Sequence, residues 1–377
     1  MKIGILTYHR SINYGAFVQA YALQKLISEC IPDAKVEIID YDSPMAEKYY
    51  RRYYLGAKSL CEIAYIQKQR KVFFNAKRLQ SCSDESLISN DLNEFKRFVE
   101  GKYDIIVVGS DEVWNITGMR GFPNAYWLPN IKECKKLAYA VSARNRITDI
   151  KPEDRDKIYN FLEEFDFISL RDEVSFQMIN EILGEKKEIH HMCDPTMAYD
   201  FEFDKQKARN ILTEKFGVNP DETVIGVMDE VGEISRYLRA KYKDSVQIIS
   251  LYKYVKGMHN SPDINPMEWI QVIGSLDGLL TSFFHGMCIA INAGTPFRIF
   301  EYRNVSEAKM SKSYDLLSQY GFDDHYFQMN QREDFRMCVD EFIKDHLEKK
   351  RDNYTVIKNG ERGKFEIFKK ALVDITK

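Results

Sequence analysis

The sequence predicts an α/β protein with two domains, each built around a parallel sheet. The chain of 377 residues exceeds the length at which one hydrophobic core usually stops growing. Short apolar runs typical of buried strands recur along it, and helical patterns separate them. Strands that alternate with helices pair in parallel, because a crossover helix returns the chain to the same edge of the sheet.

The first domain is expected to cover residues 1–205. It opens with a buried strand at 3–7, a polar loop that contains a glycine, and a helix on which Ala16, Ala20, Leu23 and Ile27 share one face. Further buried strands are predicted at 36–41, 104–109, 136–141 and 167–170.

The second domain is expected to cover residues 206–332, because the loop between Asp200 and Asp221 separates it from the first. Strands are predicted there at 223–227, 246–251, 276–281 and 296–301. From 333 to 377 the pattern is helical and charged. These C-terminal helices could pack back on the first domain.

Composition excludes several classes of protein. The net charge of −3 gives the whole protein no electrostatic reason to bind nucleic acid. The seven cysteines are scattered and contain no C-x-x-C pair, so neither a disulfide framework nor a zinc ribbon is expected. The spacing in 190–194, His-His-Met-Cys-Asp, resembles no standard metal site, and Asp194-Pro195-Thr196 is typical of a turn that closes a strand. We expect no metal, no cofactor and a cytoplasmic location, since no apolar stretch reaches bilayer-spanning length.

Residues 47–78 form an insertion rich in tyrosine, phenylalanine, lysine and arginine. It carries nine basic residues against Glu47 and Glu62, a local balance of +7. One interpretation is a surface that contacts anionic lipid headgroups at the inner face of the membrane, or a lipid-linked substrate. The other is a solvated pair of helices whose aromatic rings pack inward.

A histidine and a glycine stand where one apolar run ends and another begins, in the segment from Leu279 to Cys288. Parallel sheets bind ligands at the carboxyl ends of their strands, and Gly286 would let backbone approach a ligand there. His285 can exchange protons near neutral pH. The alternative is that His285 is a hydrogen-bonded core residue.

Two segments of the first domain could bind a sugar. Asn13, Tyr14 and Gly15 end the first loop at the start of a helix, where an anion or a sugar can bind. Asp111 and Trp114 follow a strand, so the carboxylate could hold or deprotonate hydroxyls and the indole could stack on a sugar face. Equally, Asp111 could cap a helix and Trp114 could be a core residue.

Cationic side chains also follow predicted strands. Arg171 comes directly after one, where a guanidinium could bind phosphate or carboxylate, or form an ion pair with a neighbouring acid. A loose series of basic residues follows His285, and some of them could face a cleft between the two predicted domains. The series consists of Arg298, Arg303, Lys309 and Lys312.

Taken together, these motifs resemble the polysaccharide pyruvyl transferase family. The resemblance rests on an ordered series over roughly residues 1–330: Gly4-Ile5-Leu6-Thr7, Asn13-Tyr14-Gly15-Ala16, Gln19-Ala20-Tyr21-Ala22-Leu23, Gly109-Ser110-Asp111-Glu112-Val113-Trp114-Asn115, Ser169-Leu170-Arg171-Asp172-Glu173, Asp194-Pro195-Thr196, Phe284-His285-Gly286 and Gly294-Thr295-Pro296-Phe297.

The resemblance implies two Rossmann-like domains that face a cleft, as in GT-B glycosyltransferases. It also implies transfer of pyruvate from phosphoenolpyruvate to two hydroxyls of a sugar of a polysaccharide or its lipid-linked precursor, giving a cyclic ketal. The first domain would bind the acceptor and the second the donor. Catalysis would use His285 and Asp111, donor binding Arg171, Arg144, Arg298 and Gly286, and acceptor binding Asn13, Tyr14, Gly15 and Trp114.

The chain departs from the family in its His-Gly turn. Many relatives have Asp-Ser-Phe-His-Gly or Arg-Leu-His-Gly, whereas this chain has Ser282-Phe283-Phe284-His285-Gly286. A second phosphate-binding arginine is missing there, and Arg144 could compensate. Two rival functions therefore stay open: a glycosyltransferase that uses a nucleotide sugar, and a non-catalytic carbohydrate-binding protein of polysaccharide assembly.

Overall fold

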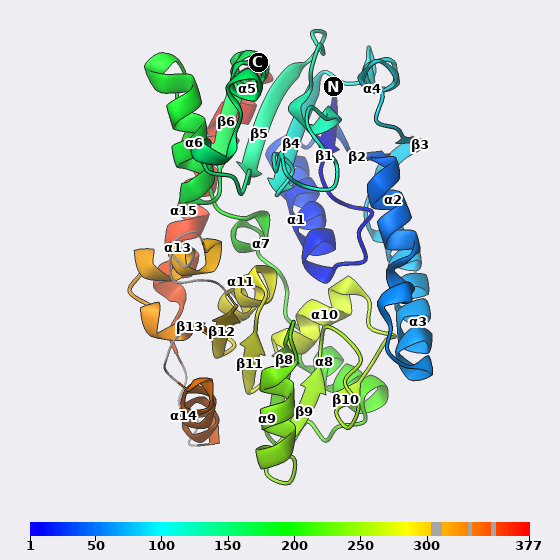
Figure 1. Cartoon of the computed structure of the whole chain (residues 1–377), viewed down its shortest axis with the longest axis vertical. Coiled ribbons are helices and arrows are strands. Elements are labelled where there is room, and N and C mark those ends of the chain that lie inside the picture. The colour runs from blue at the N-terminus through cyan, green and yellow to red at the C-terminus, as the bar shows by residue number, and fades with distance from the viewer. Residues whose placement is uncertain (303–310, 331–333, 348–351) are drawn as a thin grey trace. The chain divides into compact units, whose positions relative to one another are not determined.

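A computed structural model describes residues 1–302, 311–330, 334–347 and 352–377 of the chain, which divides into two compact units (Figure 1). Unit 1 consists of Met1–Leu55, Lys77–Tyr199 and Gly360–Lys377. Unit 2 consists of Gly56–Ala76 and Asp200–Asn359. The middle of the basic insertion therefore belongs to unit 2, and the end of the C-terminal helix belongs to unit 1.

Unit 1 contains a parallel sheet in the order β3-β2-β1-β4-β5-β6-β7 (Figure 1). In this sheet β1 lies between β2 and β4, with Ile3 opposite Val36 on one side and Ile105 on the other. The strands are β1 (Lys2–Leu6), β2 (Lys35–Asp42), β3 (Cys82–Ile88), β4 (Ile105–Asp111), β5 (Lys135–Val141), β6 (Phe167–Leu170) and β7 (His190–His191).

The helices of unit 1 begin at polar caps. Asn13 caps α1 and Asp172 caps α6, each accepting a hydrogen bond from a backbone N–H of the first turn. The α-helices are α1 (Tyr14–Cys30), α2 (Pro44–Arg51), α4 (Leu92–Val99), α5 (Pro152–Glu163), α6 (Glu173–Leu183) and α7 (Pro195–Ala198).

The core of unit 1 is rich in aromatic rings. Trp114 stacks on Trp127 with ring centroids 4.9 Å apart, and Phe165 packs edge-on against Trp114. The C-terminal helix α15 (Thr355–Ile375) adds Phe368, whose ring lies 4.6 Å from that of Tyr139 on β5. The end of the chain is thus part of the unit 1 core.

Unit 2 contains a parallel sheet in the order β10-β9-β8-β11-β12-β13. Its strands are β8 (Val224–Met228), β9 (Gln247–Ser250), β10 (His259–Asn260), β11 (Gly278–Thr281), β12 (Phe297–Glu301) and β13 (Tyr326–Gln328). Its α-helices are α3 (Leu60–Ala76), α8 (Lys205–Ile211), α9 (Glu233–Tyr242), α10 (Pro266–Ile273), α11 (Phe284–Ala293), α13 (Lys312–Gln319) and α14 (Phe335–Leu347).

Two features shape the core of unit 2. Asn265 and Glu268 form a capping box at the start of α10, which carries the buried Trp269. Phe342 of α14 packs against the sheet together with Phe300 of β12 and Ile225 of β8.

Two parallel sheets with helices confirm the predicted α/β class. All nine strands predicted from apolar runs are present, with small shifts at their ends. The packing of α15 on unit 1 agrees with the expectation for the C-terminal helices, whereas α14 belongs to unit 2. Across the residues that the structure describes, no helix combines the length and the apolar character needed to cross a membrane.

Candidate active site

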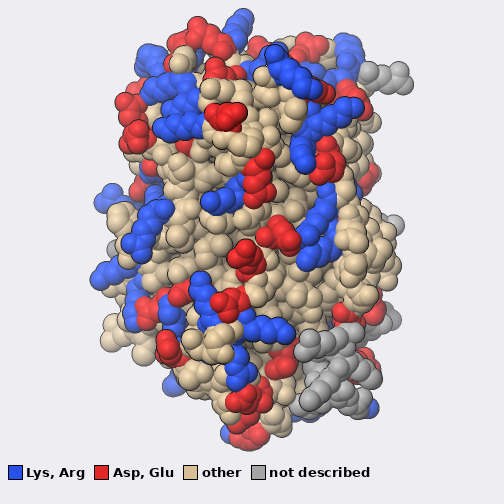
Figure 2. Space-filling view, turned by 180° about the vertical axis from the view of Figure 1, so that it is seen from behind, with Lys and Arg blue, Asp and Glu red and all other residues tan. Residues whose placement is uncertain are grey.

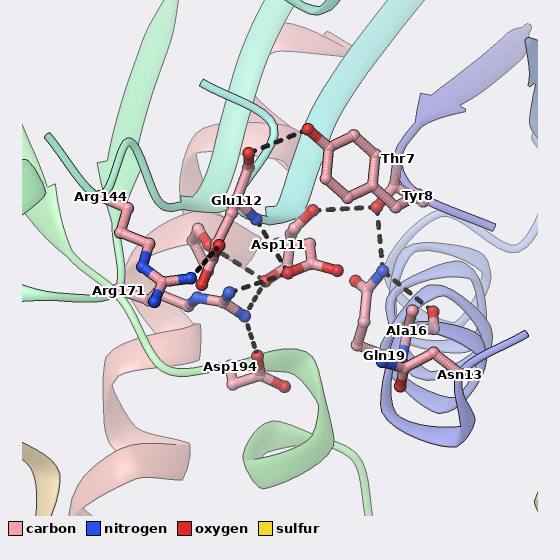
Figure 3. Close-up of polar contacts among 12 residues, drawn as sticks. Thr7, Tyr8, Asn13, Ala16, Gln19, Asp111, Glu112, Arg144, Arg171 and Asp194 are labelled. Carbon is pink, nitrogen blue, oxygen red and sulfur yellow. Dashed lines mark hydrogen bonds and ion pairs between the residues drawn. The ribbon is translucent and has the colours of Figure 1, made fainter. Parts of the chain in front are cut away.

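The carboxyl edge of the unit 1 sheet has a switch point between β1 and β4, because the strand order runs in opposite directions from there. Thr7 follows β1, and its Oγ1 donates to the carbonyl oxygen of Ser110 at 2.9 Å. Gln19 of α1 donates from Nε2 to Thr7 Oγ1, also at 2.9 Å (Figure 3). These bonds hold the start of α1 beside the end of β4.

The predicted acceptor residues Asn13, Tyr14 and Gly15 lie at this switch point. Asn13 is exposed, and its Oδ1 caps α1 by accepting from the N–H of Ala16 at 3.2 Å. Tyr14 and Gly15 are the first two residues of the helix and are buried. The helix N-terminus is therefore directed at the edge where the polar residues of β4 end.

Arg171, Asp111 and Asp194 form a buried ionic cluster at this edge (Figure 3). Arg171 donates from Nη1 to Asp194 Oδ2 at 2.7 Å and from Nη2 to Asp111 Oδ1 at 3.0 Å. The side chains of Arg171 and Asp194 are 1% and 0% exposed, while that of Asp111 is 14% exposed. Two carboxylates around one guanidinium give the cluster a formal charge of −1.

The surroundings keep Arg171 protonated. Burial alone would lower its pKa, but the carboxylates of Asp111 and Asp194 raise the pKa of the guanidinium above its ordinary value. The sequence suggested that Arg171 contacts the donor or pairs with a neighbouring acid. The structure places its guanidinium between two carboxylates in the core, so Arg171 here orients Asp111 instead of presenting a charge to solvent.

Asp111 has an unusual backbone conformation. Its φ is +87°, and Gly109, two residues earlier, has a φ of +110°. A Cβ on Gly109 would lie 2.3 Å from the carbonyl oxygen of Tyr139, so this position needs glycine. Both the N–H of Glu112 and Arg171 donate to Oδ1 of Asp111, whereas Oδ2 points toward α1 (Figure 3). One carboxylate oxygen is held, and the other faces the switch point.

Arg144 is an exposed cation at this edge. Its side chain is 54% exposed, and Nη1 contacts Glu112 Oε2 at 3.2 Å (Figure 3). Glu112 is itself held through its carbonyl oxygen, which accepts from the hydroxyl of Tyr8 at 3.0 Å. The structure therefore brings Arg144 to the neighbour of Asp111, where its guanidinium is accessible to an anion.

Trp114 lies in the core and not at the edge. It is fully buried, its indole face stacks on Trp127, and its Nε1 donates to the carbonyl oxygen of Tyr126 at 3.0 Å. Stacking on a sugar needs an exposed ring face. The predicted role of Trp114 in acceptor binding is therefore wrong, and its alternative as a core residue is correct.

Three ion pairs at the carboxyl end of β2 had no assignment from the sequence. Asp40 accepts from His9 Nε2 and from Arg10 Nε, both at 2.7 Å. Asp42 accepts from Arg120 at 2.8 and 3.1 Å. The two acids at the end of an apolar strand could have indicated these ion pairs. Arg120 could not have been predicted as a partner, because it lies in a loop that has no recognisable sequence pattern. Together these pairs anchor the first loop and the ring of Tyr8, which lies 3.6 Å from the guanidinium of Arg120.

The carboxyl edge of the unit 2 sheet has its own switch point, between β8 and β11. His285 follows β11 as the second residue of α11 and is half-buried. The turn before it is held by Thr281, whose Oγ1 accepts from the N–H of Phe283 at 2.9 Å. The histidine thus lies where the sequence placed it, in the first turn of a helix at the carboxyl edge of a sheet.

Gly286 permits the close packing of this turn. A Cβ at this position would lie 2.9 Å from Met228 Sδ and 3.0 Å from Thr281 Oγ1. The first turn of α11 therefore sits directly over the ends of β8 and β11. Gly286 serves this approach of helix to sheet.

Lys312 of the predicted basic series lies beside the His-Gly turn. Its Nζ lies 5.2 Å from the ring of Phe284, the residue before His285. Arg298, by contrast, is held by the carbonyl oxygen of Phe297 at 2.8 Å and by Asp352 at 3.6 Å, over the ring of Phe342. The guanidinium of Arg298 is thus held within the packing of unit 2, so its predicted role in donor binding is not supported. Arg303 and Lys309 lie outside the described residues.

Within the described ranges, no three His, Cys, Asp or Glu side chains are grouped so that they could hold a metal ion. His190 and His191 instead stack on Phe167 and Phe176, respectively.

Two parallel sheets with helices, each with a switch point at its carboxyl edge, place the fold in the GT-B-like class. The fold is similar to that of UDP-GlcNAc 2-epimerase from Rickettsia bellii, with a TM-score of 0.58 at 13% identity over 100% of this chain and 96% of that chain. It is also similar to the Neisseria meningitidis epimerase bound to UDP-GlcNAc, with a TM-score of 0.55 at 12% identity over 99% and 100% of the two chains. At this identity the likeness shows the fold alone.

The family follows from the sequence match. The model of the polysaccharide pyruvyl transferase family matches residues 13–305, and the chain belongs to this family. It is therefore a transferase of polysaccharide modification, as the ordered motifs indicated. No curated protein matches the chain significantly.

Proposed function

We propose that the protein transfers pyruvate from phosphoenolpyruvate to two hydroxyls of one sugar, on a polysaccharide or its lipid-linked precursor. The observation that carries the proposal is the state of Asp111. Arg171 and a backbone N–H hold one oxygen of this carboxylate, and the other is directed toward α1 at the switch point. A fixed carboxylate of this kind suits the deprotonation of a sugar hydroxyl.

The reaction balances without a cofactor. A proton is added to the methylene carbon of phosphoenolpyruvate, and the oxygen of the first hydroxyl bonds to its C2, losing its proton to a base. The C2–O bond to phosphate then breaks, and the second hydroxyl adds to C2, giving the cyclic ketal. The proton of the second hydroxyl leaves with inorganic phosphate.

In this scheme Asp111 takes the proton of the first hydroxyl and His285 delivers the proton to the methylene carbon. An imidazole can both give and accept a proton near neutral pH. Lys312 beside the His-Gly turn and the exposed Arg144 supply positive charge for the carboxylate and the phosphate of the donor.

The first test is calorimetric titration of phosphoenolpyruvate, and separately of UDP-GlcNAc, into the purified protein. Binding of phosphoenolpyruvate supports the proposal. Binding of the nucleotide sugar alone would overturn it in favour of a glycosyltransferase. Binding of neither would overturn it in favour of a carbohydrate-binding protein.

The second test compares carboxylate variants in an assay of phosphate release with a sugar acceptor. Asp111→Asn should lower turnover by roughly 100-fold or more, since a general base contributes on that order. Asp166→Asn is the matched control, because Asp166 precedes β6 at the opposite edge of the same sheet and bonds Lys135 and Lys136. Equal turnover of the two variants would exclude Asp111 as the base.

A further inference from the structure

The segment from Met45 to Leu79 concentrates exposed apolar side chains. Thirteen large hydrophobic side chains are exposed among the described residues, and six of them lie here: Met45, Tyr49, Leu55, Leu60, Phe74 and Leu79. Single exposed hydrophobic residues are common on protein surfaces, but a concentration in one segment indicates a contact with a partner.

The same segment also differs from the rest of the chain in its net charge. Its nine lysines and arginines against Glu47 and Glu62 sum to +7, and because the whole chain carries −3, the remaining residues sum to −10. Seven of these basic residues are exposed: Lys48, Arg51, Arg52, Lys58, Lys68, Lys71 and Arg78. The two acids are already engaged, Glu47 with Arg10 at 3.6 Å and Glu62 with the N–H of Lys58 at 2.7 Å. The surface therefore favours an anionic partner.

In unit 1, helix α2 presents this combination directly. Only Ala46 of the helix is buried. Met45 and Tyr49 are exposed and lie one turn apart. The exposed Lys48 lies between them in the sequence, and the exposed Arg51 follows Tyr49. Leu55, a few residues later, is 66% exposed. Apolar side chains interleaved with basic ones are typical of helices that lie in a membrane interface.

In unit 2, helix α3 shows the same combination independently. Tyr65, Ile66 and Phe73 form its buried side, and the hydroxyl of Tyr65 donates to the carbonyl oxygen of Ser261 at 3.3 Å. Its solvent side carries Leu60 and Phe74, which are 84% and 75% exposed, with Lys68 and Lys71 between them. On the face of the molecule that Figure 2 shows, acidic and basic side chains are interspersed over most of the surface.

We propose that α2 in unit 1 and α3 in unit 2 each bind an anionic lipid surface, with the exposed apolar side chains entering the interface and the basic ones contacting headgroups. Nucleic acid would match the charge but not the exposed methionine, leucine and phenylalanine side chains. The aromatic rings of the insertion divide accordingly: Tyr65 and Phe73 pack inward, and Phe74 does not. The inward packing of Tyr65 and Phe73 agrees with the interpretation of the insertion as helices whose aromatic rings pack inward.

The position of α2 connects this surface to the candidate site. The helix follows Ser43 directly after β2 ends at Asp42, at the carboxyl edge of the unit 1 sheet. Asp111 ends β4 at the same edge. Docking through α2 would bring that edge near the membrane surface, where a lipid-linked sugar is found. The docking itself does not depend on which donor the enzyme uses.

The test is sedimentation of the full chain with vesicles of phosphatidylcholine, and with vesicles that also contain phosphatidylglycerol. We expect binding to the anionic vesicles only, weakening as salt is raised. Replacing Lys48, Arg51 and Arg52 with glutamine should weaken this binding by roughly 100-fold, since each basic residue near an anionic surface contributes about fivefold.

The matched control replaces three exposed basic residues of unit 1 outside the segment, Arg97, Lys132 and Lys151, with glutamine. This variant should bind the vesicles like the unaltered protein. A second variant, Met45→Ser with Leu55→Ser, should also lose binding, and circular dichroism checks that every variant is folded.

Three outcomes would overturn the proposal: no vesicle binding, equal binding to both kinds of vesicle, or equal loss in the control variant. Binding of RNA without vesicle binding would overturn it in favour of a nucleic-acid surface. A concentration-dependent dimer that the serine variant abolishes, again without vesicle binding, would assign the surface to a second copy of the chain.

Discussion

Arg171 donates to Asp111 at 3.0 Å from a position that is almost completely shielded from solvent. This hydrogen bond joins the end of β6 to the end of β4, and β5 lies between these two strands in the sheet. Asp194, which follows β7, accepts a hydrogen bond from the other terminal nitrogen of the same guanidinium at 2.7 Å. One arginine therefore fixes the ends of three segments at the carboxyl edge of the sheet.

Replacing Arg171 with glutamine should destabilise unit 1 by about 3–5 kcal/mol, because two buried carboxylates lose their common cation. The free energy of unfolding from urea titration measures this effect. The additional replacement Asp194→Asn should restore part of the stability, since it removes one of the unpaired charges. Arg171→Gln with unchanged stability would contradict the ionic cluster.

Gly286→Ala should displace the first turn of α11, because its Cβ would meet Met228 and Thr281 at 3.0 Å or less. Overpacking typically costs about 1–3 kcal/mol, against about 1 kcal/mol gained in helix propensity. We expect a small loss of stability and a larger loss of turnover, because His285 lies on this turn. Thermal unfolding and phosphate release, measured together, check both parts.

Gly363→Ala is the matched control for this change. Gly363 also lies within a helix, α15, but nothing lies within 4 Å of the Cβ that alanine would add. This variant should therefore be more stable by about 0.4–1 kcal/mol, with unchanged turnover. If both alanine variants shifted stability in the same direction, the packing argument at Gly286 would fail.

Asp40 should make stability depend on pH in the acid range. Burial alone would raise the pKa of this carboxyl, but hydrogen bonds from His9 and Arg10 lower the pKa well below its ordinary value. The unfolded chain then binds the proton more readily than the folded one. Stability is present in full above the ordinary pKa of aspartate and falls as pH drops toward the folded value.

Asp40→Asn should reduce the decrease in the free energy of unfolding from neutral to acid pH by on the order of 2 kcal/mol. It should also lower the free energy of unfolding at neutral pH. Urea titrations repeated from neutral to acid pH give the comparison. Asp33→Asn, at an exposed loop position, serves as the control and should leave the curve unchanged. A curve for Asp40→Asn parallel to that of the unaltered protein would contradict the assigned ion pairs.

Trp114→Phe should lower stability by about 1–3 kcal/mol, because the carbonyl of Tyr126 loses its buried donor and the stack on Trp127 shrinks. The KM for a sugar acceptor should not change, since the indole has no exposed face. Denaturation and steady-state kinetics separate the two effects. A raised KM with unaltered stability would return Trp114 to the binding site.

The strands that sequence reasoning missed share one property. β3, β10 and β13 are all edge strands, and β7, the fourth edge, was indicated only by the turn at Asp194. β3 has the sequence Cys-Ser-Asp-Glu-Ser-Leu-Ile and is largely exposed. An edge strand is paired on one side only and needs no continuous apolar run, so the apolar pattern that locates central strands is weak there.

The sequence predicted where the residues of the candidate site lie relative to the strands, but it did not predict which of these residues contact one another. Asp111, Arg171 and His285 follow apolar strands, and each lies at the carboxyl edge of a sheet as expected. The pairing of Arg171 with residues 60 positions before it and 23 after it depends on strand order, which periodicity does not encode. Trp114 and Arg298 failed for a related reason, because a residue near a strand end can face the core or a neighbouring helix.

The sequence by itself determined the α/β class, the central strands, the family and the edges at which polar residues gather. These features depend on local patterning, on residue types and on the order of short motifs. Only the tertiary structure decided that Arg171 is enclosed by carboxylates, that Trp114 is buried, and which faces of α2 and α3 are exposed. Burial and ion pairing are set by segments distant in sequence, and their free energies depend on how completely those segments exclude water.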